Sequence, residues 1–479
     1  MPGMLRRAPW LAAAAALLAV LLGETPGLTW DEPAFCVSGY AYLDGNWIPN
    51  HEHPPAAKLL YGAALHLGAD RFGPLAPARA VSALLFAALV WLTVWTGRRL
   101  FGDRAGLCAG LSLLLMPRVL AHAHLAELDM SMALMWMLAA SLSLKGLPGW
   151  KGAWILGLLW GLALLTKVNG IFLLVPLLGW GLLKKDLSWP QALAVIRIGY
   201  AVFLAGWPWL WADPVGRIQG YLLDKSDRWI VPTLYFGRVY DHAYPPWHFP
   251  LVMTAITLPP LILAASAGAG IRLLARREPG AAWLGLHLAF TLGLACLPGV
   301  PRYDGVRLFL AAFPFLALLA GRGLDLALGS LPGPRWRLGA AGMLLLLTLP
   351  GIVRMDPCLL SYYSPLAGGL EGADRLGMET TYWGDALTPD FLAALSPGTQ
   401  GFSTAPMGED YAAFLAATGW LPRAARPARD GEVLLVSGRR SMLSPGNLKA
   451  FREGPGPVLE REGVVLARIL KNGRAPDTP

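Results

Sequence analysis

Charged side chains are scarce in this sequence. Only 15% of its 479 residues are Asp, Glu, Lys or Arg, whereas 55% are hydrophobic. Soluble proteins carry about 25% charged residues. The surplus of apolar side chains excludes an ordinary soluble protein, because so much apolar surface must face something other than water. We therefore expect a chain that lies largely in a membrane.

Cysteine is also scarce, since the chain has only four. Four cysteines are too few for a disulfide framework, although one bridge between Cys36 and Cys358 is open to the chain if both lie outside the cell. The sequence has no Asn-x-Ser/Thr glycosylation site and no internal repeat. The net charge is +9, but the basic residues do not form a stripe and no nucleic-acid-binding motif accompanies them. We therefore expect no nucleic-acid partner.

Long apolar segments predict a polytopic α-helical membrane protein with about eleven transmembrane helices. Stretches of roughly 17 to 25 apolar residues are long enough to cross a bilayer. The first segment has only a weak cleavage signal, so we expect it to be retained as a span. The expected spans cover residues 8–24, 79–99, 104–120, 123–144, 152–166, 170–183, 191–211, 249–270, 281–298, 307–321 and 337–353.

Basic residues occupy every second connection between these segments. Lys and Arg gather in the short cytoplasmic loops of membrane proteins. The alternation therefore puts the amino terminus inside and the region after the last span outside. The basic groups are Arg6 and Arg7; Arg98, Arg99 and Arg104; Lys145 and Lys151; Lys184 and Lys185; Arg272, Arg276 and Arg277; and Arg322, Arg335 and Arg337.

The chain divides into a membrane domain at residues 1–353 and a small outer domain at residues 354–479. Within the membrane domain, the outer segments 25–78 and 212–248 are too long to be simple connections. Long loops of this kind are usually functional. We therefore look for the working residues on the outer side.

Apolar spacing predicts regular structure inside these outer regions. The first outer segment has helical spacing around residues 34–42 and 56–67, which predicts two short helices in the membrane interface. A helical run at 409–417 and strand-like runs at 431–436 and 463–469 predict that the outer domain is an α/β module.

Two adjacent carboxylates follow the first apolar segment directly, in the sequence Trp30-Asp31-Glu32-Pro33. A charged side chain near a bilayer is costly and is usually functional when present. These two acids therefore point to chemistry at the outer mouth of the membrane domain.

Several basic residues stand on the outer side, against the charge rule. Lys167 and Arg302 need a partner there, and an anionic phosphate is a good one because Lys and Arg both bind it. A solvated loop end is the simpler alternative for each. Lys58 follows His53-Pro54-Pro55, a rigid turn that suits the start of a helix; an ordinary interfacial helix is the alternative there.

Two His-x-His pairs, His51 with His53 and His122 with His124, lie near acidic residues. Imidazole and carboxylate together suit zinc or manganese. Residues two apart diverge on a helix, so each pair could chelate only from an extended segment. A metal site is therefore not favoured, and we expect no cofactor.

Four motifs occur in order along the chain: Trp30-Asp31-Glu32-Pro33, His53-Pro54-Pro55 with Lys58, Ala126-Glu127-Leu128-Asp129, and Thr166-Lys167-x-Asn169-Gly170. Together they resemble the GT-C superfamily of polyprenyl-phosphate-dependent glycosyltransferases, nearest to its protein O-mannosyltransferase and lipid A aminoarabinose transferase-like group. Later segments, including Tyr382-Trp383-Gly384, are similar to bacterial members, so the resemblance covers residues 8 to 385. The chain has His53 where the aminoarabinose branch has Lys.

The resemblance implies a bacterial inner-membrane enzyme whose active site faces the periplasm or cell exterior. Such an enzyme moves a sugar, with inversion, from a polyprenyl-phosphate carrier to a glycan, lipid or protein acceptor. The resemblance makes Asp31 the general base, Glu32 its orienting partner or substitute, and Asp129 the second acid. The expected phosphate ligands are Lys58, Lys167, Arg302 and Arg307, and the expected substrate-binding residues are His53, Glu127, Arg238 and Tyr303.

Two other functions remain open on the sequence alone. A transporter or flippase of an anionic lipid-linked substrate would also need buried cations, but transporters tend to show two related halves, which this chain lacks. A non-catalytic GT-C-like scaffold is the other alternative. The pair Asp31 and Glu32 in the first outer segment favours an enzyme over both.

Overall fold

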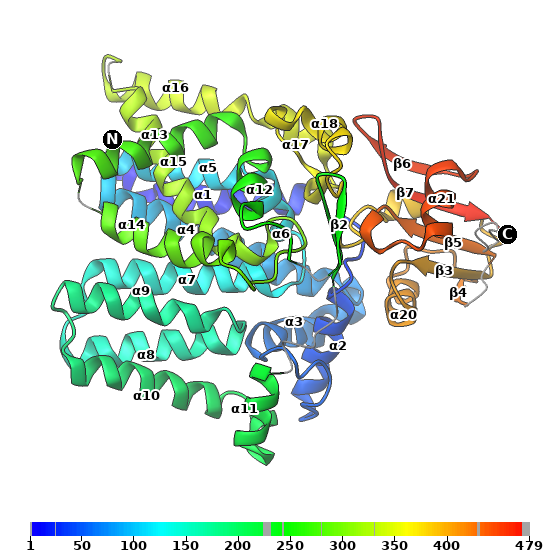
Figure 1. Cartoon of the computed structure of the whole chain (residues 1–479), viewed down its shortest axis with the longest axis horizontal. Coiled ribbons are helices and arrows are strands. Elements are labelled where there is room, and N and C mark those ends of the chain that lie inside the picture. Colours follow the sequence, from blue (N-terminus) through cyan, green and yellow to red (C-terminus); the bar gives the residue numbers. More distant parts are fainter. Residues whose placement is uncertain are drawn as a thin grey trace.

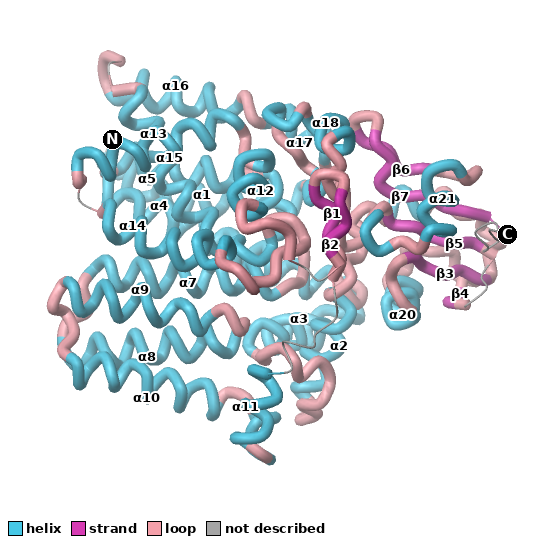
Figure 2. The backbone as a smooth tube through the Cα atoms, viewed as in Figure 1, coloured by secondary structure: helices cyan, strands magenta, loops and turns pink. Residues whose placement is uncertain are grey.

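A bundle of long helices forms the larger part of the molecule, and a small mixed sheet lies at one end of it (Figures 1 and 2). The computed structural model describes residues 2–23, 25–223, 231–241, 244–278, 280–329, 331–428 and 432–471. The bundle comprises α1 (Pro2–Leu22), α4 (Ala76–Phe101), α5 (Asp103–Leu114), α6 (Pro117–Ala123), α7 (Leu128–Lys145), α8 (Gly149–Thr166), α9 (Gly170–Leu183), α10 (Trp189–Ala205), α12 (Phe249–Thr257), α13 (Pro260–Arg276), α14 (Ala281–Leu288), η2 (Ala289–Gly293), η3 (Leu294–Cys296), η4 (Arg307–Ala312), α15 (Phe313–Ala327), α16 (Pro334–Leu346) and α17 (Leu349–Met355).

Each of the eleven expected spans overlaps at least one of these helices. Within the described ranges, four helices are long and apolar enough to cross a membrane, or five if the bent pair α5 and α6 is counted as one span. The chain is therefore a helical membrane protein with four or five spans detected, and the total of eleven stays a prediction.

The expected span at residues 104–120 is not one continuous helix. Pro117 lacks the N–H that a helix interior needs, and it disfavours helical geometry in the residue before it. Accordingly Met116 is extended (φ −90°, ψ 105°), and α6 departs from α5 at 72°. The bend leaves α6 as a short, fully buried helix.

The first outer segment folds into α2 (Glu32–Leu43) and α3 (Ala56–Phe72), which confirms the two expected helices. The two helices meet through Gly39 and Gly62. A Cβ atom on Gly39 would lie 2.1 Å from the Lys58 carbonyl oxygen, and one on Gly62 would lie 2.1 Å from that of Gly39. Glycine at both positions therefore lets the two backbones approach closely.

The second outer segment contains η1 (Pro208–Ala212), α11 (Pro214–Leu223) and a hairpin of β1 (Thr233–Tyr235) and β2 (Arg238–Tyr240). Its two turn residues, Phe236 and Gly237, have positive φ angles of 48° and 75°. Positive φ at both central positions is the geometry of the tight turns that join antiparallel strands. This hairpin was not expected from the sequence.

The end of the chain forms a five-stranded sheet in the order β4-β3-β5-β7-β6. Helix α20 and strands β5 and β7 confirm the helix and the two strands expected there. The elements are β3 (Gly401–Ala405), α20 (Glu409–Ala417), β4 (Arg426–Pro427), β5 (Val433–Ser437), η7 (Arg440–Met442), α21 (Pro445–Glu453), β6 (Val458–Arg461) and β7 (Val464–Lys471).

The segment between the bundle and this sheet packs against the first outer segment. It contains η5 (Leu359–Ser361), η6 (Pro365–Ala367), α18 (Gly369–Arg375) and α19 (Pro389–Leu392). The Trp30 N–H donates to the Trp383 carbonyl at 2.8 Å, and the Gly27 N–H donates to that of Asp385 at 2.7 Å. The residues on either side of the expected boundary at 353/354 therefore share one packed core, and the boundary itself stays a prediction.

The one disulfide that the sequence allows, between Cys36 and Cys358, is not formed. Both residues are buried. Cys108 is also buried, so of the described cysteines only the half-buried Cys296 offers a partly accessible thiol.

The basic loops predict which side of the membrane each end of the bundle faces. A cysteine introduced at the exposed position Lys449 on α21 is expected to react with an impermeant thiol reagent in spheroplasts, because the C-terminal sheet is expected outside. The matched variant Lys184→Cys, in an exposed basic loop expected inside, should react only after lysis. Both substitutions would be made in a Cys296→Ser background. Labelling of Lys449→Cys only after lysis would contradict this topology.

Candidate active site

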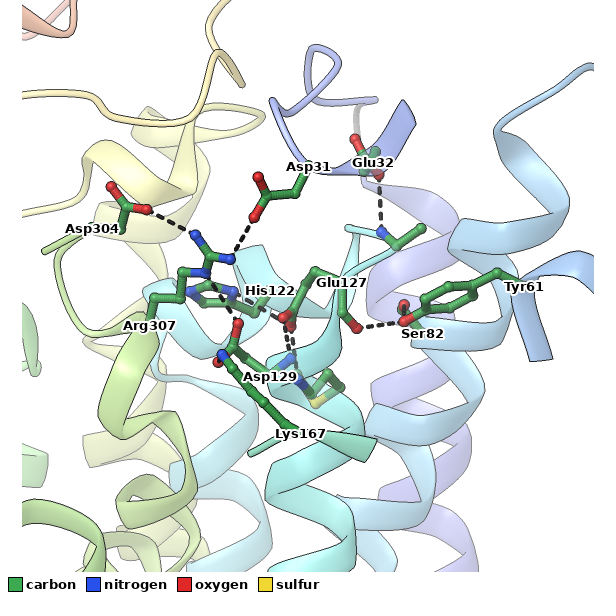
Figure 3. Close-up of polar contacts among 12 residues, drawn as sticks. Asp31, Glu32, Tyr61, Ser82, His122, Glu127, Asp129, Lys167, Asp304 and Arg307 are labelled. Atoms are coloured by element: carbon green, nitrogen blue, oxygen red, sulfur yellow. Dashed lines mark hydrogen bonds and ion pairs between the residues drawn. The ribbon is translucent and has the colours of Figure 1, made fainter. Parts of the chain in front are cut away.

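The guanidinium group of Arg307 is bonded to three carboxylates (Figure 3), at the end of the bundle where α2 begins. Its Nη2 atom donates to Asp31, its Nε donates to Asp129 at 3.1 Å, and its Nη1 donates to Asp304 at 2.8 Å. The three acids come from the start of α2, the first turn of α7 and the turn before η4. The fold therefore joins segments that are up to 276 residues apart around one cation.

Asp129 has a second cationic partner, because Lys167 Nζ donates to its other carboxylate oxygen. Lys167 is the first residue after α8 and has an extended backbone (φ −158°, ψ 149°). The chain therefore leaves the helix at Lys167, whose side chain reaches the first turn of α7. The indole ring of Trp383 covers Arg307, with its centre 4.0 Å from the guanidinium carbon. A cation over an aromatic face is attracted to the ring electrons.

The turn before η4 has an unusual backbone that aims Asp304 at Arg307. Asp304 and Gly305 have positive φ angles of 53° and 61°. A Cβ atom at position 305 would lie 2.4 Å from Nη1 of Arg118 and 2.9 Å from the ring of Tyr382. Only glycine fits this position, both for its backbone angle and for the space available.

Asp31 differs from the other acids of this cluster in its exposure. Its side chain is 30% exposed, whereas those of Asp129 and Asp304 are 4% and 3% exposed. Asp31 is the residue that precedes α2, and its carboxylate lies at the rim of the cluster while the other two are buried. Of the three acids bonded to Arg307, Asp31 is the one that a ligand can reach.

Glu32 is held in a different direction from its neighbour Asp31 (Figure 3). Its buried carboxylate accepts two hydrogen bonds from Arg79, at 2.8 and 2.7 Å, and one each from the backbone N–H groups of Thr29 and Ala126, both at 2.9 Å. Both oxygens are therefore occupied. This geometry suits a residue that fixes the first outer segment to α4 and α7, and does not suit a substitute base.

Glu127 caps the first turn of α7. Its carboxylate accepts from the backbone N–H groups of Asp129 and Met130, and His122 Nδ1 lies 3.6 Å from it. A carboxylate at this position satisfies N–H groups that the helix leaves unpaired. The observed contacts give Glu127 a capping role beside Asp129, and its expected substrate-binding role stays a prediction.

The remaining candidate cations do not contact the Arg307 cluster. Lys58 is fully buried and donates to Tyr42 Oη at 2.7 Å and to the carbonyl oxygens of Asn50 and His53 at 2.6 and 2.8 Å. Burial lowers the pKa of Lys58 to about 7. These bonds tie the loop between α2 and α3 to the second of these helices.

Arg302 and Arg238 likewise have other contacts. Arg302 donates to the backbone carbonyls of Ala295, Pro245 and Leu297, and so joins three stretches of chain. Arg238 is exposed on β2 and lies 5.1 Å from the centre of the Tyr240 ring.

Tyr303 and His53 complete the set of expected substrate-binding residues. Tyr303 lies close enough to Arg307, Asp304, Asp31 and Asp129 to interact with them electrostatically, and burial raises its pKa. His53 packs edge-on against Phe35, with ring centres 5.7 Å apart. Tyr303 therefore borders the cluster, whereas the observed contacts of His53 are with α2 and α3.

Two members of the cluster were not assigned from the sequence. Asp304 stands three residues before Arg307, a spacing that a search for local ion pairs could have found. Trp383 belongs to a segment that resembles bacterial relatives, but nothing in the sequence connects it with Arg307. Among the described residues, no three His, Cys, Asp or Glu side chains are grouped so that they could hold a metal ion.

Residues 52–211 match a family model described as dolichyl-phosphate-mannose-protein mannosyltransferase. No curated protein sequence matches the chain.

Two solved structures show the same fold. ArnT from Cupriavidus metallidurans, bound to undecaprenyl phosphate, is 17% identical with a TM-score of 0.54, and the match covers 98% of both chains. The oligosaccharyltransferase AglB from Archaeoglobus fulgidus, in complex with an inhibitory peptide and a dolichol-phosphate, is 11% identical with a TM-score of 0.52. That match covers 91% of this chain and 69% of AglB.

The comparisons differ in how much of the chain they cover. Most of the chain shares its fold with ArnT and AglB. Residues 52–211, about a third of the sequence, are similar to the family described as dolichyl-phosphate-mannose-protein mannosyltransferase.

The contacts of Glu32 predict a structural effect on mutation. Glu32→Gln removes the charge that compensates buried Arg79, and breaking a buried ion pair costs about 3 to 5 kcal/mol. The variant should therefore melt at a clearly lower temperature in detergent. Glu371→Gln is the matched control, because it breaks an exposed pair with Arg375, and such pairs contribute about 0 to 1 kcal/mol. Equal melting temperatures for Glu32→Gln and the control would show that the pair is not a structural anchor.

Proposed function

We propose that this protein transfers a sugar from a polyprenyl-phosphate carrier to an acceptor hydroxyl on the outer face of a bacterial inner membrane, with inversion and with Asp31 as general base. The observation that carries the proposal is a partly exposed carboxylate directly above two buried cations, Arg307 and Lys167. The acceptor is a glycan, a lipid or a protein. No metal and no further cofactor enter the reaction as we propose it.

The reaction is a single displacement at the anomeric carbon. The acceptor oxygen forms a bond to that carbon from one side while the bond to the phosphate oxygen breaks on the other, and this in-line path inverts the configuration. The departing phosphate oxygen keeps the electron pair, and Asp31 takes the proton of the acceptor hydroxyl. A positioned base of this kind contributes about 10² to 10⁴ in rate.

Arg307 and Lys167 supply positive charge where the phosphate develops negative charge. Both are buried, and both are held in place by Asp129 before any substrate arrives. Donors fixed in a site that excludes water stabilise a developing charge more than mobile donors in water do. We therefore assign Asp129 to positioning the two cations, and limit the expected phosphate ligands to Lys167 and Arg307.

The outer end of the bundle gives the acceptor access from the aqueous side. Asp31 directly precedes α2, and α2, α3 and the C-terminal sheet lie at the same end of the bundle (Figure 1). The exposed basic pairs Lys184–Lys185 and Arg276–Arg277 lie at the carboxyl ends of α9 and α13. This arrangement supports an outward-facing site.

The general-base assignment predicts a loss of chemistry without a loss of donor binding. Asp31→Asn keeps the size of the side chain and removes its basicity, so the rate of sugar transfer should fall by about two to four orders of magnitude. The binding of polyprenyl phosphate should remain within a few fold. Transfer rates and donor binding would be measured on purified protein in nanodiscs, with Asp390→Asn on α19 as the matched control. Near-normal transfer by Asp31→Asn would exclude Asp31 as the base.

The cation assignment predicts weaker donor binding when Lys167 is neutralised. A hydrogen bond to a charged group contributes about 1.5 to 3 kcal/mol, so Lys167→Gln should raise the Kd for polyprenyl phosphate by roughly 10- to 150-fold. The matched control is Lys449→Gln on exposed α21. Direct binding of a radiolabelled carrier would measure both. An unchanged Kd in Lys167→Gln would place the phosphate elsewhere.

A further inference from the structure

A second polar pocket lies beside the Arg307 cluster, on the far side of Asp304. About 320 Å³ of unfilled space, part of it open to solvent, lies between the hairpin, α12, the turn at 304–305 and the C-terminal segment. Its charged and tyrosine lining consists of Arg118, Asp304, Tyr363, Glu379, Tyr382 and Arg439. None of these residues has a role in the proposed transfer step.

Arg118 is the least satisfied charge in this pocket. Its side chain is 1% exposed, and its Nε atom donates to the Tyr362 carbonyl at 3.0 Å. Both of its Nη atoms are without a hydrogen-bond partner among the described residues. The guanidinium lies against the rings of Tyr363 and Tyr382, 4.6 and 5.7 Å from their centres, and no carboxylate oxygen lies within 4.0 Å of it in the described structure. Burying such a donor without a partner is costly.

Other donors share the same wall. The hydroxyl of Tyr382 and the Nε atom of Arg439 are also buried and without hydrogen-bond partners among the described residues. The unpartnered atoms therefore include nitrogen donors of two guanidinium groups and one hydroxyl that can donate. A ligand that matches them carries several acceptor oxygens on one centre, as a phosphate does.

The two acids of the pocket are already committed. Asp304 lies between two cations, with Arg439 Nη2 at 2.8 Å and Arg307 Nη1 at 2.8 Å. The Glu379 carboxylate accepts from the backbone N–H groups of Arg440 and Ser441 at 2.7 and 3.3 Å, and burial raises its pKa. The charge of Arg118 is therefore left without a carboxylate of its own.

We propose that this pocket is a second anion site, in which Arg118 and Arg439 bind a phosphate group that is not the phosphate of the sugar donor. Gly305 leaves room for Arg118, because a Cβ atom at position 305 would lie 2.4 Å from Nη1. Asp304 contacts both Arg439 and Arg307, so an anion in the pocket lies one carboxylate away from the transfer site. The phosphate belongs either to a lipid headgroup or to a soluble phosphate ester.

The test is the binding of radiolabelled inorganic phosphate to the full chain in nanodiscs, at constant ionic strength. The donor site is first saturated with polyprenyl phosphate, so that the remaining phosphate binding reports the second site. We expect Arg118→Gln and Arg439→Gln each to weaken this binding at least about tenfold. Arg375→Gln, on exposed α18, is the matched control and should bind as the wild type does.

The outcomes separate this proposal from the proposed function and identify the source of the phosphate. Phosphatidylglycerol in the nanodisc should compete with inorganic phosphate if the ligand is a lipid headgroup, and glycerol phosphate in solution should compete if it is a soluble ester. If inorganic phosphate binds in a manner that depends on Arg118 but polyprenyl phosphate does not bind at all, the second site is supported and only the proposed function is contradicted. Two results would overturn the second site. One is that the wild type shows no saturable phosphate binding; the other is that the folded Arg118→Gln and Arg439→Gln variants bind phosphate as well as the wild type does. Water would then be the occupant of the pocket.

Discussion

The candidate active site of this protein depends on the contact of Arg307 with Asp31, Asp129 and Asp304. Burying one charge without a partner costs several kcal/mol, so a buried charged group persists only when others neutralise it. Here Lys167 and Arg439 complete the set, and three cations face three carboxylates. Each charge comes from a different part of the chain, apart from the local pair Asp304 and Arg307. The cluster therefore exists only when the bundle and the C-terminal segment are both in place.

Two adjacent acids have different tasks because a helix begins between them. Asp31 precedes α2 and Glu32 is its first residue, and neighbouring residues on a helix point about 100° apart. Glu32 turns inward to Arg79 and fixes the start of the helix. Asp31 is left at the rim beside Arg307, where a substrate can reach it. The anchoring of Glu32 is thus what keeps the proposed base in position.

Much of the fold follows from apolar patterning, and the exceptions have local causes. Every expected span overlaps a helix, and the helix at 409–417 matches α20. The break at Pro117 was missed because the apolar run continues through it, and hydropathy does not register a missing N–H. The hairpin at 233–240 was missed because its strands are only three residues long.

The site was harder to predict than the fold. Asp31, Asp129, Lys167 and Arg307 were all named from the sequence, and the structure brings them together. Lys58 and Arg302 looked equivalent to Lys167, yet they are occupied mainly by backbone carbonyls. Every residue carries such a carbonyl, so the sequence does not reveal which cation will find one. The positions of Trp383 beside Arg307 and of Arg118 in the pocket result from tertiary packing, which the sequence does not reveal.

The most direct test of the account is a cryo-EM structure of the protein with polyprenyl phosphate bound. The phosphate is expected within hydrogen-bond distance of Lys167 or Arg307, with Asp31 facing the position that the anomeric carbon of a sugar donor would occupy. A phosphate bound instead at Lys58 or Arg302, with the ion pairs of Arg307 unchanged and no lipid near Asp31, would contradict the central claim.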